Sequence, residues 1–152
     1  MTTTTAVELT PYICVHDADA AIRFYADAFG AVETYRLTGR DGRIGHAELD
    51  ISGNRLMLAD EYPEAGALGP RSIGGAAVLM HLSVPDVDAA VARAVEAGAT
   101  LVRPVADEFY GDRVGRVLDP FGYAWHISTM VEQVSAEEAK RRWDAMEGED
   151  GS

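Results

Sequence analysis

The sequence predicts an α+β fold built from two similar modules, each made of a strand, a helix and three further strands. The first observation is an internal repeat, because the segment VHDADAA at 15–21 returns 69 positions later as VPDVDAA at 84–90. The second is a repeat of the module ends, DISGNRLM at 50–57 against DPFGYAWH at 119–126, with the same spacing. Each copy of the first motif follows a short apolar run and opens a helical pattern.

The two helices have clear start and stop signals. Asp17 and Asp86 are candidate N-caps, and Gly30 and Gly98 are natural helix ends. Apolar residues recur at helical spacing between these limits and predict one buried stripe on each helix. The stripes consist of Ala18, Ala21, Ile22, Tyr25 and Phe29 in the first helix and Val87, Ala90, Val91, Ala94 and Val95 in the second.

The remaining segments complete the domain organisation. The predicted strands are 10–15, 31–38, 43–51 and 55–60 in the first module, and 77–84, 100–107, 113–118 and 123–129 in the second. We expect a flexible N-terminus at 1–7, the first module at 8–61, a Gly/Pro-rich linker loop at 62–75, the second module at 76–130, a C-terminal helix at 131–147 and a disordered tail at 148–152. A capping box at 135–138 begins the last helix.

Strand alternation predicts a concave, less apolar face. If Ile13 and Val15 face the helix, then Tyr12 lies on the opposite face, and the same alternation places His81 and His126 there in the second module. All four strands tested in this way put their less apolar residues on one side. Two half-sheets related by pseudo-symmetry are therefore expected to form a curved mixed sheet around a concave site.

Composition limits the partners. The chain of 152 residues is long enough for one well-buried domain, and its net charge of −12 opposes binding to nucleic acid or to an anionic membrane surface. No segment has membrane-spanning length and no signal sequence is visible, so we expect a cytoplasmic protein. The single Cys14 excludes an intrachain disulfide and a cysteine-cluster zinc site. The acidic charge favours a neutral or cationic small molecule.

One hairpin combines aromatic and basic side chains. The segment 109–126 (FYGDRVGRVLDPFGYAWH) reads as a strand, a type I turn at 119–122 and a second strand, with Arg113, Arg116 and His126 among the aromatic residues. Such a hairpin in an acidic protein predicts a place where a small molecule is held.

These features resemble the vicinal oxygen chelate superfamily, which includes glyoxalase I, extradiol dioxygenases, fosfomycin-resistance enzymes and bleomycin-binding proteins. The resemblance rests on the paired modules, the Val-x-Asp-x-Asp-Ala-Ala helix starts and the Asp-Pro-Phe-Gly-Tyr turn, and covers residues 8–142. The segments HAEL (46–49), MLADE (57–61), FYGDR (109–113) and VEQVS (131–135) resemble its PhnB-like branch. The resemblance implies the two-module glyoxalase/bleomycin-resistance fold and a homodimer.

The resemblance does not imply the usual metal centre. Metal-dependent members place one ligand on the first and last strand of each module, and the matching positions here are Thr10, Met57, Leu79 and His126. Only His126 is a normal ligand for zinc, nickel or iron. We therefore expect no metal ligands and no cofactor at this position. A displaced divalent-metal site, built from His46 and Glu48 with His81 or His126, is the alternative.

The candidate catalytic residues are His81 and His126, because an imidazole titrates near neutral pH and can act as a general base or orient a ligand. The alternative is a pair of hydrogen-bonded histidines that fills a polar cavity. The FYGDR segment resembles the Trp-Gly-x-Arg segment that lines the ligand groove of bleomycin-binding relatives; alternatively, Tyr110 packs at a dimer interface and Arg113 pairs with Asp112 or Asp119. The candidate ligand-binding residues are Tyr12, His46, Glu48, Met57, Phe109, Tyr110, Arg113 and Arg116.

Two function classes follow. The first is a metal-poor binding protein of the bleomycin-resistance kind that sequesters a small aromatic or cationic molecule, with Arg113, His81 and His126 orienting it. The second is a glyoxalase-like lyase or isomerase, or a dioxygenase-related enzyme, in which His81 or His126 serves as base or as displaced metal ligand. In the enzyme, Arg113 or Arg116 would stabilise an enolate. Whether the protein is an enzyme stays open at this point.

Overall fold

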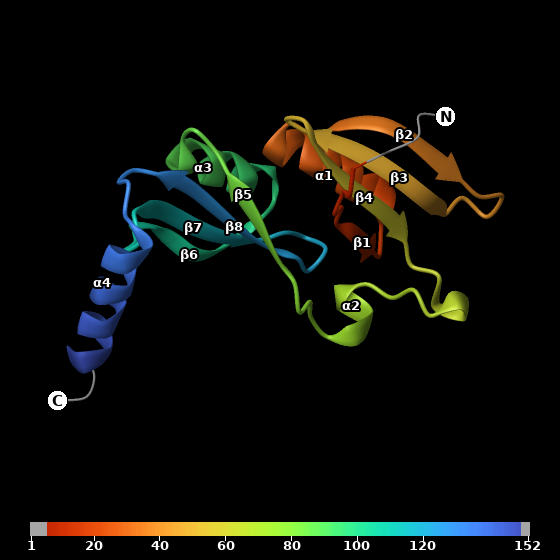
Figure 1. The fold of residues 1–152 in the computed structure, drawn as a ribbon. Coiled ribbons are helices and arrows are strands. Elements are labelled where there is room, and N and C mark those ends of the chain that lie inside the picture. Colours follow the sequence, from red (N-terminus) through yellow and green to blue (C-terminus); the bar gives the residue numbers. More distant parts are fainter. Residues whose placement is uncertain (1–5, 150–152) are drawn as a thin grey trace. The chain divides into compact units, whose positions relative to one another are not determined.

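The structure is a computed structural model that describes residues 6–149. It divides into two compact units, the first ending at Ala76 and the second beginning at Ala77 (Figure 1). Most of the expected flexible N-terminus at 1–7, and residues 150–152 of the expected disordered tail, lie outside the described residues. Gly148 and Glu149, which the sequence placed in that tail, belong to the last turn of a helix.

The first unit contains a four-stranded mixed sheet with strand order β1-β4-β3-β2. Its elements are β1 (Tyr12–Val15), α1 (Ala18–Phe29), β2 (Val32–Thr38), β3 (Ile44–Ile51), β4 (Asn54–Asp60), a 3₁₀ turn (Pro63–Ala65) and α2 (Pro70–Ile73). β1 runs parallel to β4, and the other pairs are antiparallel.

The second unit repeats this arrangement with strand order β5-β8-β7-β6. Its elements are β5 (Leu79–Ser83), α3 (Val87–Ala97), β6 (Thr100–Asp107), β7 (Asp112–Leu118), β8 (Ala124–Met130) and α4 (Ala136–Glu149). β5 is parallel to β8, as β1 is to β4. The predicted α+β fold of two strand–helix–three-strand modules is confirmed, with one four-stranded sheet in each unit.

Helix limits follow the predicted caps. The Asp17 carboxylate accepts a hydrogen bond from the backbone N–H of Ala20 at 3.0 Å, and Asp86 does the same for Ala89 at 3.2 Å. Gly30 ends α1 in the left-handed conformation, with φ of 69°. The apolar stripe of α1 is buried as predicted except that Phe29 is half-buried, whereas Val95 of α3 is exposed.

The hairpins differ in length between the units, and this shifts one strand of the repeat. Tyr12 pairs with Met57 in the first unit and His81 with His126 in the second, which keeps the spacing of 69. On the next strand, however, Met57 pairs with Glu48 and His126 pairs with Arg116. Nine residues separate Arg116 from its partner His126, whereas eight separate Glu48 from its partner Met57, so β7 is displaced by one position from the repeat read in the sequence.

The linker segment and the C-terminal helix are held by side chains. In the first unit, the Glu61 carboxylate accepts hydrogen bonds from the backbone N–H of Gly69 at 2.7 Å and from Ser72 Oγ at 2.6 Å. In the second unit, Ser135 Oγ accepts from the backbone N–H of Glu138 at 3.1 Å, which is half of the predicted capping box. The Glu138 carboxylate instead binds arginines of its own helix. None of the helices within residues 6–149 is long and apolar enough to cross a membrane.

The β7–β8 turn is organised by one buried carboxylate. Asp119 is 3% exposed and accepts hydrogen bonds from the backbone N–H groups of Phe121 and Tyr123 and from Trp125 Nε1, each at 2.9 Å. Phe121, Tyr123 and Trp125 are all buried. Asp119 thus connects the turn to the core of the second unit.

Replacing Asp119 by alanine should destabilise the protein, because three buried N–H groups lose their acceptor. Each unsatisfied buried donor costs about 1–3 kcal/mol, so we expect a loss of roughly 3 kcal/mol or more in the free energy of unfolding, measured in urea. Asp119→Asn keeps a carbonyl acceptor and should lose less. An alanine variant as stable as the parent protein would contradict this role.

Candidate functional site

The face of the second sheet opposite α3 carries a row of four polar side chains, one from each strand. His81 on β5 pairs in register with His126 on β8, His126 with Arg116 on β7, and Arg116 with Arg103 on β6. We call these four residues the second-sheet row. Arg103 was not selected from the sequence, because a register irregularity in β6 separates it from the regular alternation.

The two histidines are in direct contact. Their rings are perpendicular, with centroids 5.2 Å apart, and His81 Nε2 lies 2.9 Å from Ser128 Oγ. His126 is more enclosed, and burial lowers its pKa, with further lowering from His81, Arg116 and Arg103. The imidazole of His126 is therefore neutral near pH 7. The structure places both predicted catalytic histidines on the predicted face.

Two buried nitrogen atoms in the row lack a partner. Within residues 6–149, the buried atoms Arg116 Nε and His126 Nδ1 have no hydrogen-bond partner. Arg116 also forms no ion pair with any carboxylate in the described part of the chain. Arg103, by contrast, forms an ion pair with Glu108. The second-sheet row thus contains a half-buried guanidinium whose hydrogen-bonding capacity is unused.

Arg113, a predicted ligand-binding residue, does not belong to this row. Its guanidinium binds Asp88 at the start of α3 at 2.9 and 3.0 Å, and Asp107 at 3.0 Å. It lies three residues from Arg116, and side chains at odd spacing on a strand point to opposite faces. The alternative partners considered for it, Asp112 and Asp119, are also not the ones observed.

The two aromatic residues that precede β7, Phe109 and Tyr110, have different surroundings. Burial raises the pKa of Tyr110, as do the charges of Glu108 and Asp112, and its phenol is close enough to Arg103 and Arg116 for their charges to act on it. Phe109 lies against Trp143 of α4, with ring centroids 5.7 Å apart, and its carbonyl accepts from Arg142 at 2.8 Å. Tyr110 therefore borders the second-sheet row, whereas Phe109 secures α4.

Gly111, between Tyr110 and the start of β7, allows a bend in the chain. Its φ is +101°, and a Cβ atom at this position would lie 2.2 Å from the backbone oxygen of Glu132. No other residue fits such a close approach of two backbone segments. The glycine thereby fixes where Tyr110 lies relative to β7.

The first sheet carries an equivalent row of different chemistry. Tyr12 on β1 pairs with Met57 on β4, Met57 with Glu48 on β3, and Glu48 with Tyr35 on β2. We call these four residues the first-sheet row; Tyr35 was not selected from the sequence. Burial raises the pKa of Tyr12, with further raising from Cys14, Tyr35 and Glu48.

His46 lies beside the first-sheet row and contacts three of the predicted or observed site residues. Its Nδ1 is 2.7 Å from Tyr12 Oη, and its Nε2 is 3.5 Å from Glu48 Oε1. Its ring centroid is 5.3 Å from that of Tyr12 and 5.6 Å from that of Tyr35. The predicted ligand-binding residues Tyr12, His46, Glu48 and Met57 are thus brought together in the first unit.

The donor set does not fit the metal centre of the superfamily. Of the four positions expected to hold ligands, only His126 carries an ordinary ligand, because Thr10, Met57 and Leu79 occupy the others. Among the described residues, no three His, Cys, Asp or Glu side chains gather in a way that could hold a metal ion. The alternative displaced set is split, with His46 and Glu48 in one unit and His81 and His126 in the other.

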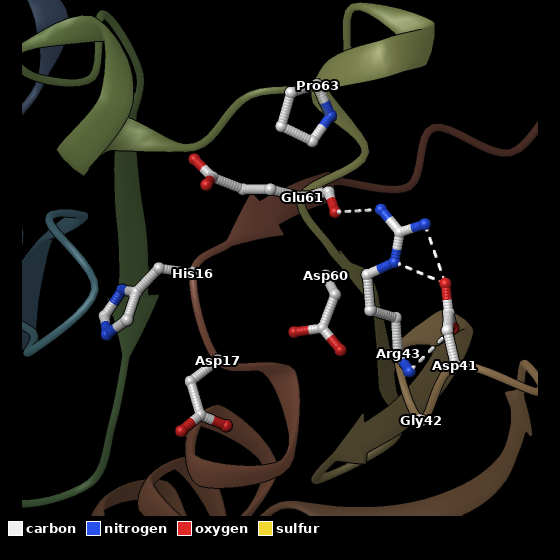
Figure 2. Close-up of a pocket in the computed structure, with 8 residues that line it drawn as sticks. All are labelled: His16, Asp17, Asp41, Gly42, Arg43, Asp60, Glu61 and Pro63. Atoms are coloured by element: carbon white, nitrogen blue, oxygen red, sulfur yellow. Dashed lines mark hydrogen bonds and ion pairs between the residues drawn. The ribbon is translucent and has the colours of Figure 1, made fainter.

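A pocket in the first unit was not foreseen from the sequence. It has a volume of about 500 Å³ and is lined by His16, Asp17, Asp41, Gly42, Arg43, Asp60, Glu61 and Pro63 (Figure 2). Its charged groups already serve the fold. The Asp60 carboxylate accepts from the backbone N–H groups of Ala18 and Ile44, each at 2.7 Å, and Arg43 is paired with Asp41 and Glu64. We therefore place the candidate site on the sheet faces.

Comparison with known proteins agrees with this two-module architecture. The profile of the Glyoxalase/Bleomycin resistance protein/Dioxygenase superfamily matches residues 5–127. The chain belongs to this superfamily. The match confirms the family resemblance seen in the sequence, while its PhnB-like branch stays a prediction.

Several individual proteins are similar along most of the chain. The uncharacterized protein Mb0911c of Mycobacterium bovis is 45% identical over 133 residues, which cover 86% of this chain and 88% of that protein. The Arabidopsis thaliana protein At5g48480 is 35% identical over 112 residues, covering 69% and 67%. Its crystal structure aligns with a TM-score of 0.64 at 28% identity, over 83% of this chain and 99% of the other. TioX from Micromonospora sp. ML1 aligns with a TM-score of 0.63 at 26% identity, over 82% and 99%.

The electrostatics of the second-sheet row can be measured through His126. We expect its imidazole to titrate below 6.5 in proton NMR, and Arg116→Met to raise this pKa because a nearby positive charge is removed. Arg113→Met, which removes a charge from the other face of β7, should leave it nearly unchanged. Because the unfolded chain binds this proton at higher pH, the stability that the neutral imidazole contributes is present above about pH 6.5 and is lost as the pH falls below it. A His126 pKa at or above 6.5 would refute the arrangement.

Proposed function

We propose that the protein binds a small molecule on the second-sheet row without the help of a metal ion, and that the bound group is an oxyanion or another oxygen acceptor on a planar ring. The observation that carries this proposal is the half-buried Arg116, which has no carboxylate partner within residues 6–149 and whose Nε has no acceptor. As a binding protein it would sequester this ligand without converting it.

The energetics of Arg116 favour an anionic ligand. A guanidinium withdrawn from water without a partner is unfavourable, and a charge-assisted hydrogen bond to an oxyanion offsets that cost. His126 Nδ1 is the second unpartnered group at the same place. A ligand oxygen that reaches both would satisfy the two groups at once.

The planar part of the ligand is supported by Tyr110. Its half-buried phenol borders the row, and an aromatic ring offers a flat apolar surface to another ring. The expectation of an aromatic ligand is kept in this proposal. At the second-sheet row a cationic ligand is disfavoured, because two arginines are already there.

Benzoate and benzyl alcohol form a matched pair of probes for this site. We expect benzoate to bind more tightly in titration calorimetry, and Arg116→Gln to weaken it by about 10- to 100-fold, the effect of losing a hydrogen bond between charged groups. Arg113→Gln should leave the affinity unchanged, since Arg113 is on the other face of the strand. Dialysis against EDTA should also leave it unchanged.

Three outcomes would refute this assignment. Equal affinity for benzoate and benzyl alcohol would show that the carboxylate charge of the ligand does not contribute to binding. An Arg116→Gln variant that binds benzoate like the parent protein would remove Arg116 from the site. Loss of benzoate binding after EDTA treatment would contradict a metal-independent site.

A second candidate function is proton abstraction next to a carbonyl group, and the neutral, enclosed imidazole of His126 favours it. In this reaction His126 is in the tautomer that leaves Nδ1 unprotonated: the C–H bond breaks, its proton passes to Nδ1, and the electron pair moves to the carbonyl oxygen. Arg116 lies on the neighbouring strand in register and would stabilise the resulting enolate.

Deuterium exchange distinguishes this enzyme from a binding protein. If the protein is an enzyme of this kind, it should accelerate the exchange of the methyl protons of pyruvate in D₂O, and His126→Ala should remove the acceleration. The variant's benzoate affinity should fall only a few-fold, because Arg116 is retained. A parent protein that gives no acceleration over buffer would eliminate this candidate.

A further inference from the structure

We propose that the first-sheet row, together with His46, binds the ammonium group of an organic cation. This inference goes beyond the proposed function, because it concerns the other unit and a group of opposite charge. It rests on the donors and acceptors of Tyr12, Tyr35, His46 and Glu48, taken in turn.

The phenolic proton of Tyr12 is already used in a hydrogen bond within the chain. His46 Nε2 faces the Glu48 carboxylate at 3.5 Å, which can only accept a hydrogen bond, so we assign the ring proton to Nε2. His46 Nδ1 is then an acceptor, and at 2.7 Å it receives the phenolic proton of Tyr12. The lone pairs of Tyr12 Oη remain open to a donor from outside the chain.

The Glu48 carboxylate is an acceptor with unused capacity. Its side chain is only 17% exposed, yet its nearest nitrogen partners are His46 Nε2 at 3.5 Å and the guanidinium of Arg55 at 3.8 Å. Within residues 6–149 these side-chain contacts are the ones it makes, and both are longer than a normal charge-assisted hydrogen bond. The guanidinium of Arg55 lies between two carboxylates, 3.8 Å from Glu48 and 3.9 Å from Glu8, and so forms no short ion pair with Glu48.

Two aromatic faces flank these acceptors. Tyr12 is 53% exposed and Tyr35 is 45% exposed, and both lie within ring-contact distance of His46. Aromatic faces attract organic cations through their quadrupole, and the attraction increases where the cation is partly desolvated. The surface therefore combines two tyrosine rings, one phenolic oxygen and one carboxylate.

The equivalent positions of the second sheet show that this chemistry is specific to the first unit. Register places Glu48 where the second sheet has Arg116, and Tyr12 where it has His81. The second-sheet row presents unpartnered donors, whereas the first-sheet row presents acceptors and π-faces. A ligand that brings several N–H donors and a positive charge, namely a primary ammonium on an organic group, complements it.

Benzylamine, which is protonated at pH 7, tests this inference against the neutral probe benzyl alcohol. In ¹H–¹⁵N NMR titrations we expect benzylamine to shift amide signals of β1, β2 and β3, with an affinity at least 10-fold above that of benzyl alcohol. Glu48→Gln should reduce the benzylamine affinity by 10-fold or more. Tyr12→Phe, which keeps the ring and removes the phenolic oxygen, should reduce it several-fold.

Glu33→Gln is the matched control, because Glu33 is on β2 but pairs with Arg36 on the other face of the sheet. Its benzylamine affinity should equal that of the parent protein, and the dispersion of the spectra shows that every variant is folded. Equal binding of benzylamine and benzyl alcohol, or an unchanged affinity in both Glu48→Gln and Tyr12→Phe, would overturn the inference. Benzoate is titrated separately into the same protein variants, and its amide shifts in β5–β8 are recorded. Failure of this site and failure of the proposed function are therefore distinguishable.

Discussion

The parallel pairing of the first and last strand of each module is the constraint on which the two candidate sites depend. A parallel pair needs a crossover, and here the helix of each crossover covers one face of its sheet. The other face is left for side chains that need not be apolar. Backbone hydrogen bonds then hold Tyr12 beside Met57, and His81 beside His126, whatever their side chains are. The fold supplies the positions and the side chains supply the chemistry.

Because the backbone is repeated, the difference between the two rows can be attributed to side chains alone. One exchange, Glu48 for Arg116, reverses the charge at the centre of the row. Neighbouring residues change with it, since Tyr12 and Tyr35 offer rings and an oxygen where His81 and Arg103 offer ring nitrogens and a cation. Under the two proposals, the rows recognise ligand groups of opposite charge. This is consistent with the general observation that function belongs to sites and not to folds.

The sequence was sufficient for the eight strands, the two crossover helices and the C-terminal helix, but not for the short helical turns at 63–65 and 70–73 or for the register of the strands. Asp17, Asp86 and Gly30 mark helix limits through local hydrogen bonds and local backbone conformation, so they can be read from neighbouring residues. Arg103 and Tyr35 could not be found in this way, because strand pairing across an irregular ladder decides which face they join. The extra residue between the paired positions of the β7–β8 hairpin, which makes Arg116 the counterpart of Glu48, is likewise visible only when the strands are paired. Arg113 was selected through the resemblance of its FYGDR segment to a ligand-groove segment, and only alternation along the paired strand shows that it lies on the face opposite to Arg116.

Arg113 and Arg116 together support the proposal that the second-sheet row is a binding surface. The chain has 25 acidic residues against 13 basic ones, so carboxylates are abundant. Arg113, on the helix side of β7, is bound by two of them. Arg116, three residues later on the same strand, has none within the described residues, and its Nε is buried. In so acidic a protein a half-buried arginine without a carboxylate is not explained by a shortage of partners. It is explained if the partner is a group that comes from outside the chain.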